Sequence, residues 1–290
     1  MTGGRRPGED WLCEEQAPGV WLCLGVKRWL VRRRTSHQLL DLADTESHGR
    51  VLTLDGRVML SERDEFFYHE MLVHPALLAH PFPTKVLIVG GGDGGALRET
   101  LRHPVDQVIL AEIDREVIEV AREWLPSVHQ GAFDDRRVTV VVSPGEEFLP
   151  QYHGEFDVIL VDSSDPVGPG AALFEPRFFR ACQKALNDSG ILALQSGSPH
   201  LAPAELQSVV GFLRSLFPYV LPYLGFAPLY PSGLWSYVLA SKREIPDEGE
   251  LWRRHQARGL RTRYFTPAVF RAATVLPPFL EELLSPCPNG

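Results

Sequence analysis

Acidic residues stand in two loops of the sequence where they could bind or deprotonate a cationic ligand. Asp93 lies inside the glycine-rich stretch VLIVGGGDGG, and Asp162 and Asp165 lie in the stretch FDVILVDSSDPVGPG. Each loop follows an apolar run that predicts a buried strand. Because open α/β sheets bind ligands beyond the carboxyl ends of their strands, we expect both acidic loops to border one site.

The glycine-rich stretch predicts an adenosine-containing ligand. Gly90, Gly92 and Gly95 satisfy the G-x-G-x-x-G pattern between a predicted strand and a predicted helix. Glu112 follows about 20 residues later, where an acidic side chain accepts hydrogen bonds from ribose hydroxyls. The alternative is a tight strand–helix turn that binds no ligand, and Glu112 makes that alternative less favourable.

Asp93 indicates which adenosine ligand the loop binds. A dinucleotide would present its pyrophosphate to this loop, and two like charges 4 Å apart cost about 1 kcal/mol in water and several times more in a drier site. A sulfonium or an amine would be attracted instead. The carboxylate therefore favours an S-adenosyl compound, and especially one that has no carboxylate of its own.

Asp162 and Asp165 could bind Mg²⁺, bind an amine, act as a base or only cap a turn. We favour the amine, because an alkylamine has a pKa of roughly 10 and arrives protonated. A carboxylate can bind that cation and then accept its proton. Asp162, at the strand end, is the expected base, and Asp165 is expected to hold the amine. No metal site is expected, because no histidine or third acid follows at ligand spacing.

Alternating elements position these loops. From residue 85 onward, apolar strands alternate with amphipathic helices, which predicts a Rossmann-like, doubly wound, mostly parallel α/β sheet. The preceding residues read as strands and turns, with a hairpin at Asp55-Gly56 and then a helix within DEFFYHEMLVHPALLAH. We expect a small N-terminal β domain with its hairpin and linking helix over residues 1–80. The catalytic domain is expected over residues 81–290, with a frayed tail.

Composition and charge narrow the class of protein. The 290 residues include 29 Lys and Arg against 37 Asp and Glu, a formal net charge of −8 that disfavours a nucleic-acid partner. No secretory signal is recognisable, and residues 20–31 are too short and too charged to span a membrane. We therefore expect a cytoplasmic protein with no membrane partner.

The cysteines and several histidines are expected to play no part in chemistry. In a reduced compartment, free buried thiols are the default for the four cysteines. His74, His80 and His103 are expected at the surface or at helix ends, because no metal spacing links them. The four cysteines are Cys13, Cys23, Cys182 and Cys287.

Several motifs together resemble the spermidine synthases, the polyamine aminopropyltransferases. The likeness covers residues 35 to 280 with the motifs in order, including ERDEFFYHEMLVHP, VLIVGGGDGGALRETLRHP, EIDREVIEVAREWLP and VDSSDPVGPGAALFEPRFF. The resemblance implies a class I methyltransferase-like fold and the transfer of an aminopropyl group from decarboxylated S-adenosylmethionine to a polyamine. Methylthioadenosine would be released, no cofactor would be tightly bound, and the chain would form a homodimer or homotetramer.

The resemblance also implies roles for individual residues. Asp162 would be the proton acceptor, and Asp93 would contact amine groups as well as the donor. The donor and its nucleoside would be bound by Gln38, Gly90, Gly92, Asp93, Glu112, Pro144, Gly145 and Pro169. The amine would be bound by Tyr68, His69, Asp93, Asp162, Ser163, Ser164, Asp165 and Tyr230.

The sequence departs from the family pattern on both sides of the site. Where the family has an acid-Gly pair whose carboxylate reads the adenine amino group, this chain has Pro144-Gly145, and proline offers neither a carboxylate nor an N–H. Gly197 stands where eukaryotic members have an acid that helps to hold the far amine. Putrescine is the default acceptor, but the sequence leaves agmatine, cadaverine and spermidine open.

Two other functions remain open at the level of sequence. One is an S-adenosylmethionine-dependent methyltransferase on the same fold, although Asp93 would then face the carboxylate of the donor. The other is a degenerate homologue that binds polyamine or nucleoside without catalysis, for which Pro144 is the best indication.

Overall fold

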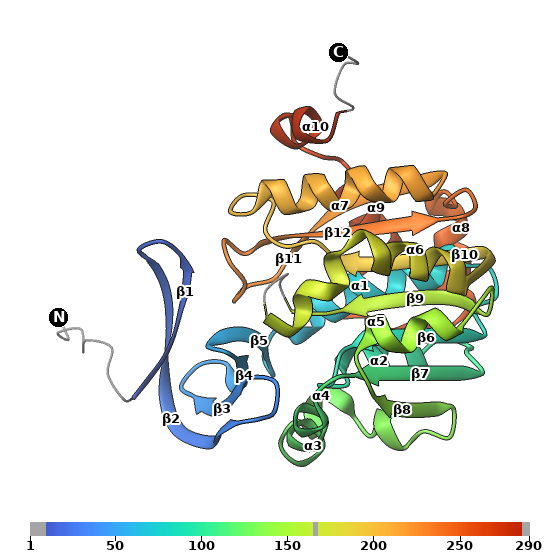
Figure 1. Ribbon diagram of the computed structural model, residues 1–290. Helices are drawn as coiled ribbons and strands as arrows, with labels where there is room; N and C mark the ends of the chain where they lie inside the picture. The colour runs from blue at the N-terminus through green and yellow to red at the C-terminus, as the bar shows by residue number, and fades with distance from the viewer. Residues whose placement is uncertain (1–9, 165–167, 286–290) are drawn as a thin grey trace.

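The computed structural model describes residues 10–164 and 168–285, which form two sheets packed side by side (Figure 1). The N-terminal sheet is antiparallel, and its strands follow chain order: β1 (Trp11–Ala17), β2 (Val20–Arg34), β3 (Leu39–Thr45), β4 (Gly49–Leu54) and β5 (Arg57–Ser61). Leu42 and Leu52 of this sheet belong to the same apolar core as Val86 of the larger sheet. The two sheets are therefore joined by packing as well as by the chain.

The predicted hairpin is present between β4 and β5. Asp55 and Gly56 form its turn with φ values of 49° and 77°, and Leu54 pairs with Arg57. Positive φ at both central residues matches the turn type that fits the twist of paired strands, which is why Asp-Gly marks such turns.

The linking helix α1 (Glu65–Ala79) is buried on nearly all sides instead of on the one face that its spacing predicts. It also contains Pro75, whose missing N–H leaves the carbonyl four residues earlier without its helical partner. That carbonyl belongs to Met71 and accepts a hydrogen bond from the Tyr223 hydroxyl at 2.8 Å. The helix continues through Pro75 because a distant side chain satisfies this carbonyl.

The larger sheet has seven strands in the order β11-β12-β10-β9-β6-β7-β8. The strands are β6 (Lys85–Gly90), β7 (Gln107–Glu112), β8 (Val138–Val142), β9 (Phe156–Asp162), β10 (Leu186–Gln195), β11 (Tyr219–Phe226) and β12 (Leu234–Ser241). Strands β6 to β10 are parallel, which confirms the predicted doubly wound fold, and β12 pairs antiparallel with both β10 and β11. The chain runs from β6 towards β7 and β8 and returns to β9 on the other side of β6, so the strand order reverses there.

Helices cover both faces of this sheet (Figure 1). Alternate residues of β6 enter different cores, Val86 and Ile88 on one face and Leu87 and Val89 on the other. The remaining helices are α2 (Gly95–Leu101), α3 (Arg115–Trp124), α4 (Pro126–His129), η1 (Ala132–Asp134), α5 (Gly145–Phe148), η2 (Leu149–Gln151), η3 (Gly168–Phe174), α6 (Pro176–Ala185), α7 (Pro203–Leu216), α8 (Glu248–Ala257), α9 (Pro267–Ala273) and α10 (Pro278–Leu284). No helix of the described residues is long and apolar enough to cross a bilayer.

One predicted helix end is wrong. The pattern PRFFRACQKALND predicts a helix that Gly190 closes, but α6 ends at Ala185 and β10 begins at Leu186. Leu186 pairs with Phe156 of β9, and the register then shifts before Ile191. Pairing with a neighbouring strand outweighs the helical pattern of the last few residues.

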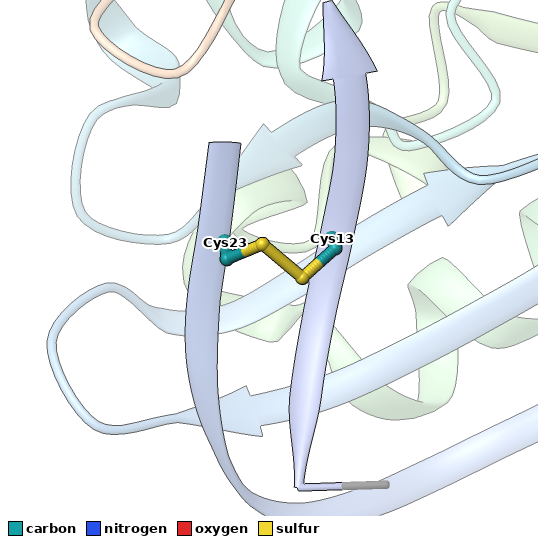
Figure 2. The surroundings of a disulfide bond; sticks show 2 residues. All are labelled: Cys13 and Cys23. Carbon is teal, nitrogen blue, oxygen red and sulfur yellow. A yellow bond between two sulfur atoms is a disulfide. The ribbon is translucent and has the colours of Figure 1, made fainter. Parts of the chain in front are cut away.

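The expectation of free thiols is wrong for two cysteines. Cys13 and Cys23 stand directly opposite each other on β1 and β2 and form a disulfide bond, with their Cα atoms 4.2 Å apart (Figure 2). The pairing depends on the register of a hairpin that turns at Gly19, where φ is 77°, and cysteine spacing alone does not show that register. Cys182 is free and buried as predicted, whereas Cys287 and the tail lie outside the described residues.

The expected exposure of three histidines is also wrong. His74, His80 and His103 are buried, although His80 does end α1 as predicted. His74 Nδ1 and His103 Nε2 share a hydrogen bond of 2.9 Å between α1 and the turn after α2. These side chains are partners in a buried polar network, which a sequence pattern does not distinguish from a surface position.

Candidate active site

The glycine loop contacts the end of β9. Gly90 has a φ of 79°, and a Cβ atom on it would lie 2.2 Å from the carbonyl oxygen of Asp162. The amide of Gly91 donates a hydrogen bond of 2.9 Å to the same carbonyl. Only glycine allows this conformation and this approach. The loop therefore brings Asp93 and Asp162 together where the strand order reverses, as the sequence predicts.

The start of α2 presses against His69 of α1. A Cβ atom on Gly95 would lie 2.2 Å from the ring carbon Cε1 of His69. Asp93 Oδ1 accepts a hydrogen bond of 2.7 Å from the amide of Gly95 and lies 3.4 Å from His69 Nε2. The absence of a side chain at Gly95 thus makes room for the imidazole beside the carboxylate.

His69, Asp93 and Asp162 form a buried charged cluster. His69 Nε2 lies 4.0 Å from Asp162 Oδ2, and this oxygen receives no hydrogen bond from the described residues. Burial raises the pKa of Asp162 to about 6, and the charge of Asp93 adds to that rise. Burial lowers the pKa of His69, but Asp93 and Glu65 outweigh it and hold that pKa well above its ordinary value. The cluster places one imidazole among carboxylates that favour its charged form, beside a buried carboxylate oxygen of Asp162.

Glu112, at the end of β7, forms the opposite wall. Its two carboxylate oxygens accept hydrogen bonds from the amides of Gly92, at 3.1 Å, and Asp114, at 2.9 Å. Burial raises the pKa of Glu112 to about 7. Gln38 reaches this wall from the N-terminal sheet and donates a hydrogen bond of 3.0 Å to Asp114. Gln38 and Glu112, two of the residues predicted to bind the donor and its nucleoside, therefore lie on one side of the cavity.

One cavity of about 740 Å³, its open mouth included, joins these groups. Leu52, Leu54 and Met59 of the N-terminal sheet close one side of it. The predicted site residues that line it are Gln38, Tyr68, His69, Gly90, Gly92, Asp93, Glu112, Asp162, Ser163, Ser164 and Tyr230.

A second cavity adjoins the first and contains residues that the sequence reading missed. It shares Tyr68, Ser163 and Tyr230 with the first cavity. Its new members are Glu14, Arg57, Gln195 and Trp235, together with neighbouring apolar groups. We call this second cavity the far lobe.

Glu14 gives the far lobe a buried carboxylate. Glu14 is 5% exposed and lies on the same face of β1 as Leu12, whereas Cys13 lies on the opposite face. The sequence does contain a signal for Glu14: it is a charged residue at a strand position where the alternating pattern predicts an apolar one. Gln195 supports the same lobe by donating hydrogen bonds to the carbonyl oxygens of Ser163, at 3.2 Å, and Ser164, at 3.3 Å.

Four predicted site residues are not placed in the cavity. Pro144 precedes α5 and is not among the lining residues, and Gly145 packs so closely on β6 that a Cβ atom would lie 2.2 Å from Val89 Cγ1. Asp165 lies outside the described residues, and Pro169 is described only through the backbone of η3. Nothing in the described residues assigns a ligand contact to these four.

The folded chain contains a cluster of ligand-type atoms that spacing along the sequence does not predict. Linear spacing shows no histidine near Asp162, but ligand-type atoms of His69, Asp93 and Asp162 lie within 4.8 Å of one another. Residues from three separate segments make this cluster, so spacing along the chain does not describe it. Its size and charge suit a small cation, and an ammonium group has both properties.

Comparison with known proteins identifies the family. A family model described as the spermine/spermidine synthase domain matches residues 65–248, and one described as the spermidine synthase tetramerisation domain matches residues 10–62. The chain belongs to the spermidine synthase family. This confirms the resemblance carried by its motifs, and the second match supports an oligomeric assembly of the family member.

Individual relatives agree over nearly the whole chain. The polyamine aminopropyltransferase of Shouchella clausii is 42% identical over 277 residues, which is 95% of this chain and 99% of that protein. That of Thermoanaerobacter sp. is 40% identical over 276 residues, or 95% and 98% of the two chains. A crystal structure of spermidine synthase in complex with the transition state analogue AdoDATO superposes with a TM-score of 0.91, at 37% identity over 96% of each chain.

Proposed function

We propose that this spermidine synthase family member transfers the aminopropyl group of decarboxylated S-adenosylmethionine to a polyamine, with putrescine as the default acceptor. The observation that carries the proposal is the position of Asp162. Asp162 lines the first cavity directly before Ser163 and Ser164, which line both cavities at their junction. A base at that junction touches both substrates.

The donor would lie along the glycine loop. Glu112 and Gln38 would hold the ribose hydroxyls, since carboxylate and amide oxygens accept such hydrogen bonds. The amine of the donor tail would lie at Asp93, whose carboxylate attracts a cation and repels a second carboxylate. The donor is a co-substrate, and no tightly bound cofactor is needed for this reaction.

The acceptor would extend from Asp162 into the far lobe. Its reacting amine would be held by Asp162 and the neighbouring Ser163 and Ser164, and its far amine would approach Glu14. Tyr68 and Tyr230 flank the route between them, with ring centroids 5.5 Å apart. The aromatic walls suit the methylene chain of a diamine, and the carboxylates suit its two ends.

The transfer is a single displacement. Asp162 accepts a proton from the ammonium group, and the freed lone pair on nitrogen attacks the carbon beside the sulfonium. The carbon–sulfur bond breaks with its electron pair on sulfur, which leaves neutral methylthioadenosine. The residues supply orientation and a base, which are sufficient because the sulfonium is already a good leaving group.

The oligomeric state that we propose follows the family. We propose that the chain forms a homodimer or homotetramer through the region that matches the tetramerisation domain, residues 10–62. A cytoplasmic location without a nucleic-acid or membrane partner remains the prediction from charge and composition. Asp165 and Pro169 keep their proposed roles in amine and adenine binding.

Incubation with decarboxylated S-adenosylmethionine and a panel of amines tests the proposal. The panel contains putrescine, cadaverine, agmatine and spermidine, and products are identified by mass. We expect methylthioadenosine and an aminopropylated amine, with putrescine used best. Failure to release methylthioadenosine with every amine would exclude the proposed function.

A further inference from the structure

A buried ion pair lies behind the active-site cluster, on the side away from the cavity. Arg98 of α2 donates to both carboxylate oxygens of Glu65 of α1, each at 2.9 Å. Both side chains are 6% exposed. Arg98 is held on its other side by Glu99, through a hydrogen bond of 2.7 Å from Nε. The Glu65–Arg98 pair is therefore fixed from both ends and cannot turn towards solvent without breaking buried contacts.

Glu65 also contacts His69 directly. Its Oε2 lies 2.7 Å from His69 Nδ1 in a hydrogen bond between residues one helical turn apart. A carboxylate of this kind only accepts, so Nδ1 carries the proton. The ring is thereby fixed with Nε2 directed towards the cavity cluster.

The second ring nitrogen faces two further carboxylates. His69 Nε2 lies 3.4 Å from Asp93 and 4.0 Å from Asp162. An unprotonated Nε2 would present a lone pair to these acceptors, which is repulsive, whereas a protonated Nε2 can donate. With Nδ1 already protonated by its bond to Glu65, this arrangement favours a proton on Nε2 as well.

We propose that Glu65 and Arg98 are positioning residues that keep His69 a cation aimed at Asp93 and Asp162, so that the base remains ionised until the substrate amine arrives. The inference rests on the proposed function, because it concerns the same reaction. The pair touches no substrate and acts only through His69. Arg98 keeps Glu65 ionised and in place, and Glu65 keeps the imidazolium charged and oriented.

The surrounding charges agree with this assignment. Burial raises the pKa of Glu65, but His69 and Arg98 outweigh it and lower that pKa overall. The charge of His69 lowers the pKa of Asp162 against burial and Asp93, which raise it. The titratable and charged groups in and around this set are Asp64, Glu65, Tyr68, His69, Asp93, Arg98, Glu99, Glu112, His129, Asp162, Tyr230 and Tyr237.

The pH dependence of Glu65→Gln tests the pair. In the wild type, we expect kcat/KM to fall as the pH drops below about 6, because the raised pKa of Asp162 lets this carboxylate protonate there. Without Glu65 the charge on His69 is lost near neutral pH, so the pKa of Asp162 rises further. We expect this acidic limb to move up by about one pH unit and kcat/KM at pH 6 to fall about fivefold. Binding of methylthioadenosine should stay unchanged, and Glu65→Asp should restore part of the wild-type profile.

Glu155→Gln is the matched control, because Glu155 forms an exposed ion pair with Lys85 at 2.6 Å and lies outside the cavity. Its profile should equal that of the wild type. A Glu65→Gln variant that folds, binds methylthioadenosine and keeps the wild-type acidic limb would overturn the proposal.

Nitrogen NMR tests the same inference on the wild-type protein itself. The ring signals of His69, assigned by their loss in His69→Gln, should show both nitrogens protonated at pH 8. A neutral ring at that pH would overturn the proposal. The NMR measurement does not depend on turnover. A failure of the proposed function would show instead as the absence of methylthioadenosine release by the wild type, so the two outcomes can be told apart.

Discussion

The two ends of the cavity are built in different ways. The end at the glycine loop is made by backbone: Gly90 and Gly91 contact the end of β9, and the amide of Gly92 bonds to Glu112. The far lobe is made by side chains from separate segments, with Glu14 on β1 and Trp235 on β12. A loop between adjacent parallel strands is specified locally, whereas the far lobe exists only after the two sheets have packed together.

This contrast suggests that the two ends of the cavity bind different substrates. The backbone-built end has little freedom to change without losing the sheet, so it suits the constant part of the reaction, the nucleoside donor. The side-chain-built end can change one residue at a time, so it suits the choice of amine. Asp162 lines the glycine-loop end directly before Ser163 and Ser164, which border both ends, and variants at either end should affect different kinetic constants.

The largest effect is expected at the junction. Asp162→Asn removes the proton acceptor, and a positioned base contributes roughly 10²–10⁴-fold to rate. We expect turnover to fall by that range while methylthioadenosine still binds, measured by product release and calorimetry. Asp134→Asn, in an exposed ion pair with Arg122, is the control that should change neither quantity. Near-normal turnover in Asp162→Asn would remove this residue from its role.

Asp93→Asn tests whether the donor end selects against a carboxylate. The wild type should prefer decarboxylated S-adenosylmethionine over the carboxylated donor, because the buried charge of Asp93 repels the second carboxylate. Removal of that charge should reduce the ratio of the two affinities by at least about tenfold, which corresponds to about 1.4 kcal/mol. Titration calorimetry with both donors measures the ratio, and an unchanged ratio would mean that Asp93 is only a cap of α2.

Glu14→Gln tests the far lobe. Hydrogen bonds to charged groups contribute about 1.5–3 kcal/mol, so loss of the carboxylate should raise the KM for putrescine about tenfold or more. The KM for the donor should not change. Glu15→Gln is the matched control, because Glu15 is the next residue along β1, faces solvent and accepts a local hydrogen bond from the amide of Gly19. Equal effects of both variants would place the far amine elsewhere.

Chelation should have the smallest effect. The cluster of His69, Asp93 and Asp162 is assigned to an ammonium group, so prior dialysis against EDTA should leave the rate of methylthioadenosine release unchanged. Initial rates before and after dialysis, with Mg²⁺ added back, provide the measurement. A loss of activity that Mg²⁺ restores would assign the cluster to a metal ion instead.

The sequence predicts the backbone-built end well. Glycines at a strand–helix junction, an acid after the next strand and Asp162 after β9 each have a local signal, and the structure places them around one cavity. It predicts the far lobe poorly, because Glu14 becomes a site residue only through the packing of β1 against the loop before β12, where Gln16 donates a hydrogen bond to the carbonyl oxygen of Leu229. The Cys13–Cys23 bond and the burial of His74 were missed for the same reason, since both depend on register or tertiary contacts.

A competition between the two donors tests the central claim most directly. The protein is incubated with putrescine and equal concentrations of S-adenosylmethionine and its decarboxylated form, and all products are identified by mass. We predict methylthioadenosine and aminopropylated putrescine in equal amounts, with S-adenosylmethionine unconsumed. Formation of S-adenosylhomocysteine and a methylated amine, with the decarboxylated donor intact, would contradict the account.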